Sequence, residues 1–155
     1  KKKNLSNTLK KKIFKLKMEH YKFNFKSQAI WFNQNIGDKD IHNLLFYKNQ
    51  LIGYNCLRKI FFNEKNKKYF FLFDNLLITK KFKNFGFSNK ILYTSNKFIK
   101  KEKTFGVLFC KKNMLNYYKK FNWIEMKPSL IRSSKLKKLK CMQFNIRNKI
   151  SRITF

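Results

Sequence analysis

Cysteine and histidine are scarce in this sequence, which limits the chemistry that it can support. The three cysteines, Cys56, Cys110 and Cys141, are odd in number and far apart, no Cys-x-x-Cys occurs, and only His20 and His42 supply imidazoles. This pattern favours a reducing compartment and argues against a structural zinc site. We therefore predict a cytoplasmic protein that needs no metal.

Long apolar runs are also absent. No run approaches the roughly 20 residues that a membrane-spanning helix needs, and the N-terminal segment lacks the apolar centre of a signal peptide. The first residue is Lys rather than Met, which is consistent with a start upstream of residue 1. With no internal repeat or linker, the 155 residues predict a single domain over 1–155.

Acidic residues are few, with seven Asp and Glu against 38 Lys and Arg and a net charge of +31. A strongly basic small protein is typically a nucleic-acid or ribosome binder, so this function is kept as an alternative. However, 34 of the 38 basic residues are Lys and Asn occurs 19 times, a bias that an AT-rich genome would produce regardless of function. A phosphate-binding surface would favour Arg, because the guanidinium binds phosphate with two parallel hydrogen bonds.

Hydrophobic spacing predicts the order of helices and strands. Leu5, Leu9, Ile13 and Leu16 recur every three to four residues among lysines, which indicates an amphipathic helix. Asn24 is a suitable N-cap for a second helix. The other predicted elements are strands over 41–47 and 51–62 with a turn at 48–50, a turn at 63–68, a strand over 69–78, a helix after Gly86 that ends at Lys100-Lys101, a strand over 105–110, a helix containing Tyr118, a segment over 123–126 ended by Pro128, and a last strand over 140–147.

Two segments of the chain carry the functional signal. Residues 74–88 have the pattern of a buried strand, a basic turn and the start of a helix. Exposed amides in such a turn and the helix dipole together make an anion site, which suits a diphosphate. The second segment is the apolar run that ends in Leu108-Phe109-Cys110, followed by Tyr118 and Trp123.

Both segments resemble the GNAT superfamily of N-acetyltransferases, most clearly over residues 69–123. The pyrophosphate loop of the superfamily has the pattern Gln/Arg-x-x-Gly-x-Gly/Ala. The segment from Lys83 to Ser88 resembles it, with the order basic, Asn, Phe, Gly, Phe, small. The second segment is similar to the fifth strand and fourth helix of the superfamily. Asn122 replaces the usual Gly before the final aromatic residue, which a left-handed helix cap tolerates. Lys111 stands where the helix often begins with Asn.

The resemblance implies an α/β (α+β) fold, with a GNAT-like mixed central sheet of about six to seven strands and about four helices. The fourth and fifth strands of that fold, here 69–78 and 105–110, would splay apart. The pantetheine of acetyl-CoA would then bond to the main chain of the fourth strand, and its diphosphate would lie on the loop amides. The implied cofactor-binding residues are Leu76, Leu77, Ile78, Lys83, Asn84, Phe85, Gly86, Phe87, Ser88, Asn89 and Lys111.

Acetyl transfer needs a neutral amine and a proton for the departing thiolate. The resemblance implies that Tyr118 is this acid, and that the amide of Leu77 or Ile78 holds the thioester oxygen. Cys110 is rejected as a covalent nucleophile, because no His or Asp is placed to activate it.

The general base is left open between Asp74, His42 and ordered water. Asp74 lies four residues before Ile78 and shares its face in an ideal strand, although a bulge is common in this strand of the superfamily. His42 is expected to titrate near neutral pH. A Glu found on the fifth strand of some relatives would fall at Gly106, which cannot serve.

The sequence therefore predicts an acetyl-CoA-dependent N-acetyltransferase. Its acceptor would be a primary amine of a small molecule, neutral or anionic, such as a nucleotide-linked amino sugar. The early helices and the hairpin that holds Asp40 and His42 would bind it. A homodimer is compatible with this prediction. The alternatives are a basic RNA-binding or ribosome-associated protein, and a protein with the GNAT fold that lacks catalysis.

Overall fold

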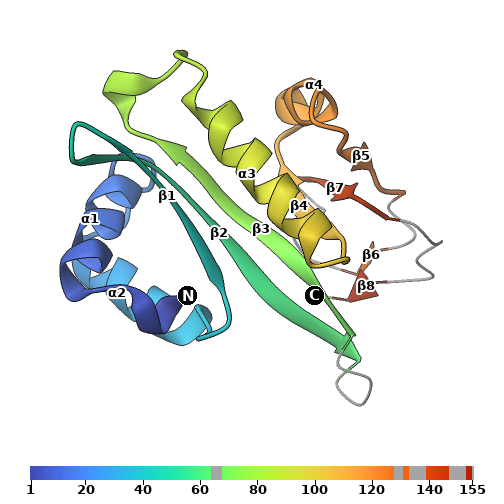
Figure 1. Ribbon diagram of the computed structural model, residues 1–155, viewed down its shortest axis with the longest axis horizontal. Helices are drawn as coiled ribbons and strands as arrows, with labels where there is room; N and C mark the ends of the chain where they lie inside the picture. The colour runs from blue at the N-terminus through green and yellow to red at the C-terminus, as the bar shows by residue number, and fades with distance from the viewer. Residues whose placement is uncertain (64–67, 128–130, 133–138, 147–152, 155) are drawn as a thin grey trace. The chain divides into compact units, whose positions relative to one another are not determined.

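The computed structural model describes residues 1–63, 68–127, 131–132, 139–146 and 153–154. In chain order (Figure 1), its elements are η1 (Lys2–Asn4), α1 (Asn7–Met18), α2 (Phe25–Asn35), β1 (Ile41–Tyr47), β2 (Gln50–Asn63), β3 (Lys68–Ile78), η2 (Lys80–Phe82), α3 (Phe87–Lys101), β4 (Gly106–Cys110), η3 (Lys112–Met114), α4 (Leu115–Lys119), β5 (Ile124–Glu125), β6 (Ile131–Arg132), β7 (Lys140–Phe144) and β8 (Ile153–Thr154). The predicted order is confirmed for the two early helices, the three strands that follow, and the later alternation of helix and strand. Most of the predicted turn at 63–68, and Pro128, lie outside the described residues.

Local hydrogen bonds explain where the first helices begin. The hydroxyl of Ser6 accepts from the amide of Leu9 at 3.2 Å and starts α1. The side chain of Asn24 accepts from the amide of Ser27 at 2.9 Å, which confirms it as the N-cap of α2. None of the described helices is long and apolar enough to cross a membrane.

Six of the described strands form one mixed sheet in the order β1-β2-β3-β4-β7-β5, and β6 pairs with β8 in a second sheet. Strands β1 and β2 form an antiparallel hairpin in which His42 faces Cys56. Strands β3 and β4 are parallel, with the register Phe71 to Gly106 and Leu72 to Val107. They are the two strands predicted over 69–78 and 105–110, and helix α3 connects them, as a parallel pair requires. This mixed sheet confirms the predicted fold class.

The chain divides into two compact units, and each is built from two segments. Unit 1 comprises Lys1–Lys59 and Asp74–Ser95, and unit 2 comprises Ile60–Phe73 and Asn96–Phe155. Strands β2 and β3 and helix α3 therefore each contribute residues to both units. The single domain over 1–155 stays a prediction.

In unit 1, helices α1 and α2 bury an apolar cluster against the hairpin (Figure 1). The leucines and isoleucine of the predicted amphipathic stripe supply part of it, so the apolar face of α1 is used for packing. Full burial of one such side chain contributes roughly 1.5–3 kcal/mol. The buried members of the cluster are Leu5, Ile13, Phe14, Leu16, Phe32, Ile36, Leu51, Tyr54, Cys56 and Leu77.

In unit 2, the core is built around Trp123, which is 1% exposed. Its ring stacks on Phe144 at 5.4 Å between centroids and meets Phe73 edge-on at 5.7 Å. The indole Nε1 donates a hydrogen bond to Asn96 Oδ1 at 3.1 Å, so the one polar group of the side chain is satisfied. Gly106 lies beside this ring, and a Cβ there would come within 3.0 Å of Trp123 Cη2.

Candidate active site

The orientation of the candidate base Asp74 depends on a bulge in β3. Asn75 has a left-handed φ of 63°, and its carbonyl accepts from Asn55 Nδ2 at 2.8 Å. The extra residue shifts the alternation of side chains. Asp74 thus lines a pocket formed with α1 and α2, and Leu77 joins their apolar cluster. Ile78 lies instead beside Gly53, on the side of α3. Asp74 and Ile78 therefore do not share the face that an ideal strand would give them, which is the outcome that a bulge in this strand allows.

Asn55, which holds the bulge, is itself fully buried and fixed by neighbours. Its Oδ1 accepts hydrogen bonds from Ser95 Oγ at 3.0 Å and from Asn43 Nδ2 at 3.1 Å. Asn43 also donates to Ser95 Oγ at 2.9 Å, which closes the network. A buried polar network satisfied in this way specifies one arrangement of the strand.

The loop after β3 has the geometry of an anion nest. Asn84 and Gly86 have positive φ values of 66° and 74°, and α3 begins directly afterwards at Phe87. Alternating backbone conformations of this kind turn successive amides toward one side, where the helix N-terminus adds its partial positive charge. The amide of Asn89 donates to the carbonyl of Gly86 at 3.0 Å and is used within the turn. Phe85 is 73% exposed at the tip.

Three consecutive side chains after α1 hold the end of β3, and sequence reasoning missed them. Glu19 Oε2 accepts from the amide of Lys80 at 2.9 Å, His20 Nε2 donates to the carbonyl of Ile78 at 2.9 Å, and the hydroxyl of Tyr21 donates to Asn75 Oδ1 at 2.8 Å. We call Glu19, His20 and Tyr21 the α1 clamp. His20 thereby uses one of the two lone pairs of the Ile78 carbonyl.

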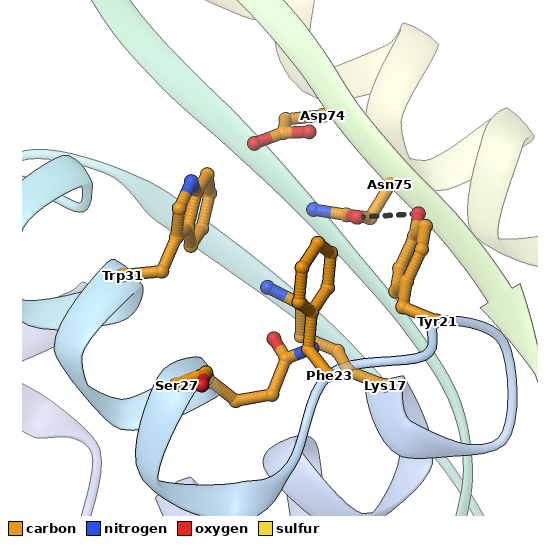
Figure 2. Close-up of a pocket in the computed structure, with 8 residues that line it drawn as sticks. Lys17, Tyr21, Phe23, Ser27, Trp31, Asp74 and Asn75 are labelled. Carbon is orange, nitrogen blue, oxygen red and sulfur yellow. Dashed lines mark hydrogen bonds between the residues drawn. The ribbon is translucent and has the colours of Figure 1, made fainter.

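Between α1, α2 and β3 lies a cavity of about 430 Å³, which we call the α1–α2 pocket (Figure 2). Aromatic side chains form its walls, with polar groups from the helices and from β3. The carboxylate of Asp74 and the amide of Asn75 come from β3, and Figure 2 shows Tyr21 hydrogen-bonded to Asn75. The lining residues are Lys17, Tyr21, Phe23, Ser27, Gln28, Trp31, Asp74 and Asn75.

Charged groups gather around the Trp31 ring of this pocket. The Nζ of Lys17 lies 4.1 Å from the ring centroid, and the guanidinium carbon of Arg58 lies 5.8 Å from it. Arg58 Nη1 is 3.9 Å from Asp74 Oδ2. Burial lowers the pKa of Lys17, and the negative charge of Asp74 opposes this shift.

His42, the other candidate base, is packed between two rings of unit 1. Its imidazole stacks on Phe32 at 5.8 Å and on Tyr54 at 5.9 Å, and its Nδ1 lies 2.9 Å from the Tyr54 hydroxyl. Burial, with smaller effects of nearby positive charge, lowers the pKa of His42 to about 4. The expected titration near neutral pH is therefore wrong. His42 lies outside the lining of the α1–α2 pocket.

The lowered pKa of His42 predicts a pH-dependent stability. The unfolded imidazole has a pKa of about 6.5, whereas the folded value is about 4. Between these values the unfolded state binds more protons, so the melting temperature should fall as the pH is lowered from 6.5 to 4. A His42→Gln variant should show a shallower fall in thermal scans over this range, and parallel curves for the two proteins would refute the prediction.

In unit 2, the candidate acid Tyr118 is 8% exposed on the short helix α4. Its ring meets Tyr117 edge-on at 5.2 Å and Phe73 at 6.3 Å. Asn122 has a φ of 64°, which confirms the left-handed cap predicted for it. Lys111 is exposed just before η3, and its carbonyl accepts from the amide of Met114 at 2.9 Å. The role of Tyr118 as acid stays a prediction.

Two further residues of β4, Gly106 and Cys110, occupy crowded or buried positions. A Cβ at Gly106 would come within 2.8 Å of Ile99 and 3.0 Å of Trp123, so a carboxylate has no room there. Cys110 is buried, and burial raises the pKa of its thiol, with a further effect of Glu125. The thiolate is therefore disfavoured, in agreement with the rejection of Cys110 as a nucleophile. Within the described residues, no group of His, Cys, Asp and Glu side chains could hold a metal ion.

Several solved structures of similar shape are N-acyltransferases or N-acetyltransferases. An acyl-CoA N-acyltransferase from Pseudomonas aeruginosa has a TM-score of 0.68 at 12% identity, covering 92% of this chain and 94% of that chain. The PaiA N-acetyltransferase of Thermoplasma acidophilum, in complex with coenzyme A, has a TM-score of 0.61 at 14% identity, covering 90% and 94%. The Bacillus subtilis N-acetyltransferase YlbP, in complex with coenzyme A, has a TM-score of 0.59 at 12% identity, covering 86% and 89%.

The amino-acid sequence itself is matched by no protein-family model and by no curated protein. At identities this low, the similarity of the solved structures concerns the fold. Sheet order, the parallel β3–β4 pair and the loop before α3 all agree with it. This chain has the GNAT fold of the N-acetyltransferases.

Proposed function

We propose that this protein is a cytoplasmic N-acetyltransferase that moves an acetyl group from acetyl-CoA to a primary amine of a small molecule. The observation that carries the proposal is the nest formed by Asn84 and Gly86 at the start of α3. It suits a diphosphate chemically, because its backbone amides and the nearby side chains of Lys81 and Lys83 are donors or positive charges.

The cofactor residues are proposed in two groups. Lys83, the nest and the first turn of α3 would hold the diphosphate of coenzyme A. The main chain of Leu76 and Leu77, with the amide of Ile78, would bond to the pantetheine, and Lys111 is a further candidate contact. Acetyl-CoA would supply the acetyl group as an activated thioester.

The residues of this chain would then manage protons and charge. As the amine nitrogen forms its bond to the acetyl carbon and the carbon–sulfur bond breaks, the Tyr118 hydroxyl would protonate the departing sulfur, and the proton that the acylated nitrogen then loses would restore the hydroxyl. The amide of Leu77 or Ile78 would stabilise the negative charge that develops on the acetyl oxygen. Asp74 or ordered water would accept the proton that the ammonium loses. With its pKa near 4, His42 is a poorer base at neutral pH than expected.

We assign the acceptor to the α1–α2 pocket. Asp74 and Asn75 line it and are followed directly by Leu76 to Ile78, the proposed pantetheine edge. A volume of about 430 Å³ accepts a sugar-sized or amino-acid-sized body. The nucleotide-linked amino sugar suggested by the sequence is one such acceptor, since its sugar ring alone would enter the pocket.

The first test is the melting temperature with and without acetyl-CoA. A ligand at about 100 times its Kd adds about 2.7 kcal/mol to the stability of the native state, so a clear rise is expected. The assay is run in moderate salt with ATP as the polyanion control. If acetyl-CoA does not raise the melting temperature, or if ATP raises it equally, the result would contradict acetyl-CoA as the cofactor and favour the RNA-binding alternative.

A further inference from the structure

Lys17 and Asp74 are the charged residues that line the α1–α2 pocket, and Arg58 lies beside it, so two positive charges are set against one negative charge. Lys17 and Arg58 both lie against Trp31, and Asp74 is the carboxylate in the lining. Asp74 is 3.9 Å from Arg58, so these two charges largely offset each other. The ammonium of Lys17 is then left as the excess charge of the pocket.

Lys17 is unusual for a lysine on a basic helix. Most lysines of α1 are exposed, whereas Lys17 is 5% exposed and lines the cavity. Burying an ammonium is costly unless a charge or dipole compensates it. The Trp31 face supplies part of that compensation, since the Lys17 Nζ lies 4.1 Å from the ring centroid. Among the described residues, Lys17 forms no ion pair within 4.0 Å, so the pocket is suited to one more negative charge.

The two sides of the pocket differ in polarity. Helices α1 and α2 contribute the Lys17 ammonium and the Ser27 hydroxyl as donors (Figure 2). The amide of the buried Gln28 is a further donor in the lining. Strand β3 contributes the carboxylate of Asp74 on the opposite side. The walls between them are the rings of Tyr21, Phe23 and Trp31. An acceptor that matches this arrangement has an anionic group, an apolar body and an amine.

We propose that the acceptor is an amine that also carries an anionic group, a carboxylate or a phosphate, and that Lys17 binds this group and selects for it. The inference rests on the proposed acetyltransferase function. In this orientation the amine points to Asp74, next to the proposed pantetheine edge. The positive charge of Lys17 also favours the neutral form of an amine held nearby, which is the form that attacks a thioester.

The test compares matched pairs of amines that differ in one anionic group. Phenylalanine is paired with phenethylamine for the carboxylate, and glucosamine 6-phosphate with glucosamine for the phosphate. We expect kcat/KM of the wild-type protein to be at least tenfold higher for the anionic member of one pair. The pair that shows the preference identifies the anionic group.

Variants then assign the preference to Lys17. Lys17→Met keeps an unbranched side chain on Trp31 but loses the charge, and should lower the preference at least tenfold. Lys17→Arg should retain most of it. Lys11→Met, which removes an exposed charge from the same helix, should leave the preference unchanged. Circular dichroism and melting temperature confirm that each variant is folded.

Two outcomes would overturn the inference and leave the proposed acetyltransferase function in place. These are equal kcat/KM values within both pairs, or a Lys17→Met variant that slows both members of a pair equally. If no amine is acetylated, binding is measured through Trp31 fluorescence, with Trp31→Phe as the blank. If the anionic amines then bind to the wild-type protein and Lys17→Met abolishes this binding, the result would support the pocket assignment and refute the acetyltransferase function. If no anionic amine binds, the result would refute the inference.

Discussion

Replacing Tyr118 with Phe should lower kcat for acetyl transfer by about 100-fold or more, because a positioned general acid contributes roughly 10²–10⁴-fold. Phe keeps the edge-on contacts of the ring with Tyr117 and Phe73, so the helix should stay folded. The rise in melting temperature caused by acetyl-CoA should persist, since the hydroxyl is proposed to act on the departing sulfur rather than to hold the cofactor. The measurement is kcat at saturating acetyl-CoA, with the acceptor that the matched pairs identify.

Tyr117→Phe is the matched control for this variant. Tyr117 neighbours Tyr118 on α4 and lies against Phe121. It loses the same atom but has no proposed role in the reaction, so its kcat should stay within about threefold of wild type. Equal losses in the two variants would mean that the effect is structural. A protein that binds acetyl-CoA and acetylates no amine would instead have the GNAT fold without catalysis.

The largest expected loss of stability comes from Trp123→Ala, at about 3–5 kcal/mol in the free energy of unfolding. The substitution removes a fully buried ring that packs between Phe144 and Phe73, and leaves a cavity in unit 2. It also leaves Asn96 Oδ1 without the indole donor. Urea unfolding followed by circular dichroism gives the difference, provided that the slope with denaturant is unchanged.

Two companion variants separate the causes of this loss. Ile124→Ala changes the next residue, which is 63% exposed, and should stay within about 0.5 kcal/mol of wild type. Trp123→Phe keeps most of the ring contact but loses the hydrogen bond to Asn96, so it should fall between wild type and Trp123→Ala. A Trp123→Ala protein as stable as Ile124→Ala would contradict the packing described for unit 2.

Local sequence patterns were sufficient for the order of the elements. The spacing of Leu9, Ile13 and Leu16 gives a helix because only a helix places them on one face. Leu5, the first residue of the predicted stripe, lies before α1 in extended backbone, so the prediction is wrong for this residue. Asn24 begins α2 because its short side chain reaches an amide that the helix leaves without a partner. Asn122 adopts the left-handed cap for which the family pattern uses Gly.

The details of the candidate site depend on contacts that no local pattern encodes. The α1 clamp joins residues 54 to 61 positions apart, so its three side chains look like ordinary polar residues after a helix. The bulge at Asn75 reverses the facing of Ile78, and a buried Asn55 fixes it from another strand. Lys17 could not be distinguished from the other lysines of α1, because only tertiary packing places it against Trp31.

The three cysteines have a practical consequence for measuring this protein. All three thiols are buried, and burial raises the pKa of Cys56 well above its ordinary value and that of Cys141 to about 12. Aromatic disulfide reagents react with thiolates, which these side chains do not supply in the native state at neutral pH. Free coenzyme A released by acetyl transfer could therefore be followed continuously by the colour of such a reagent. If the colour develops slowly when no acceptor amine is present, this increase would report hydrolysis of acetyl-CoA or unfolding of the protein.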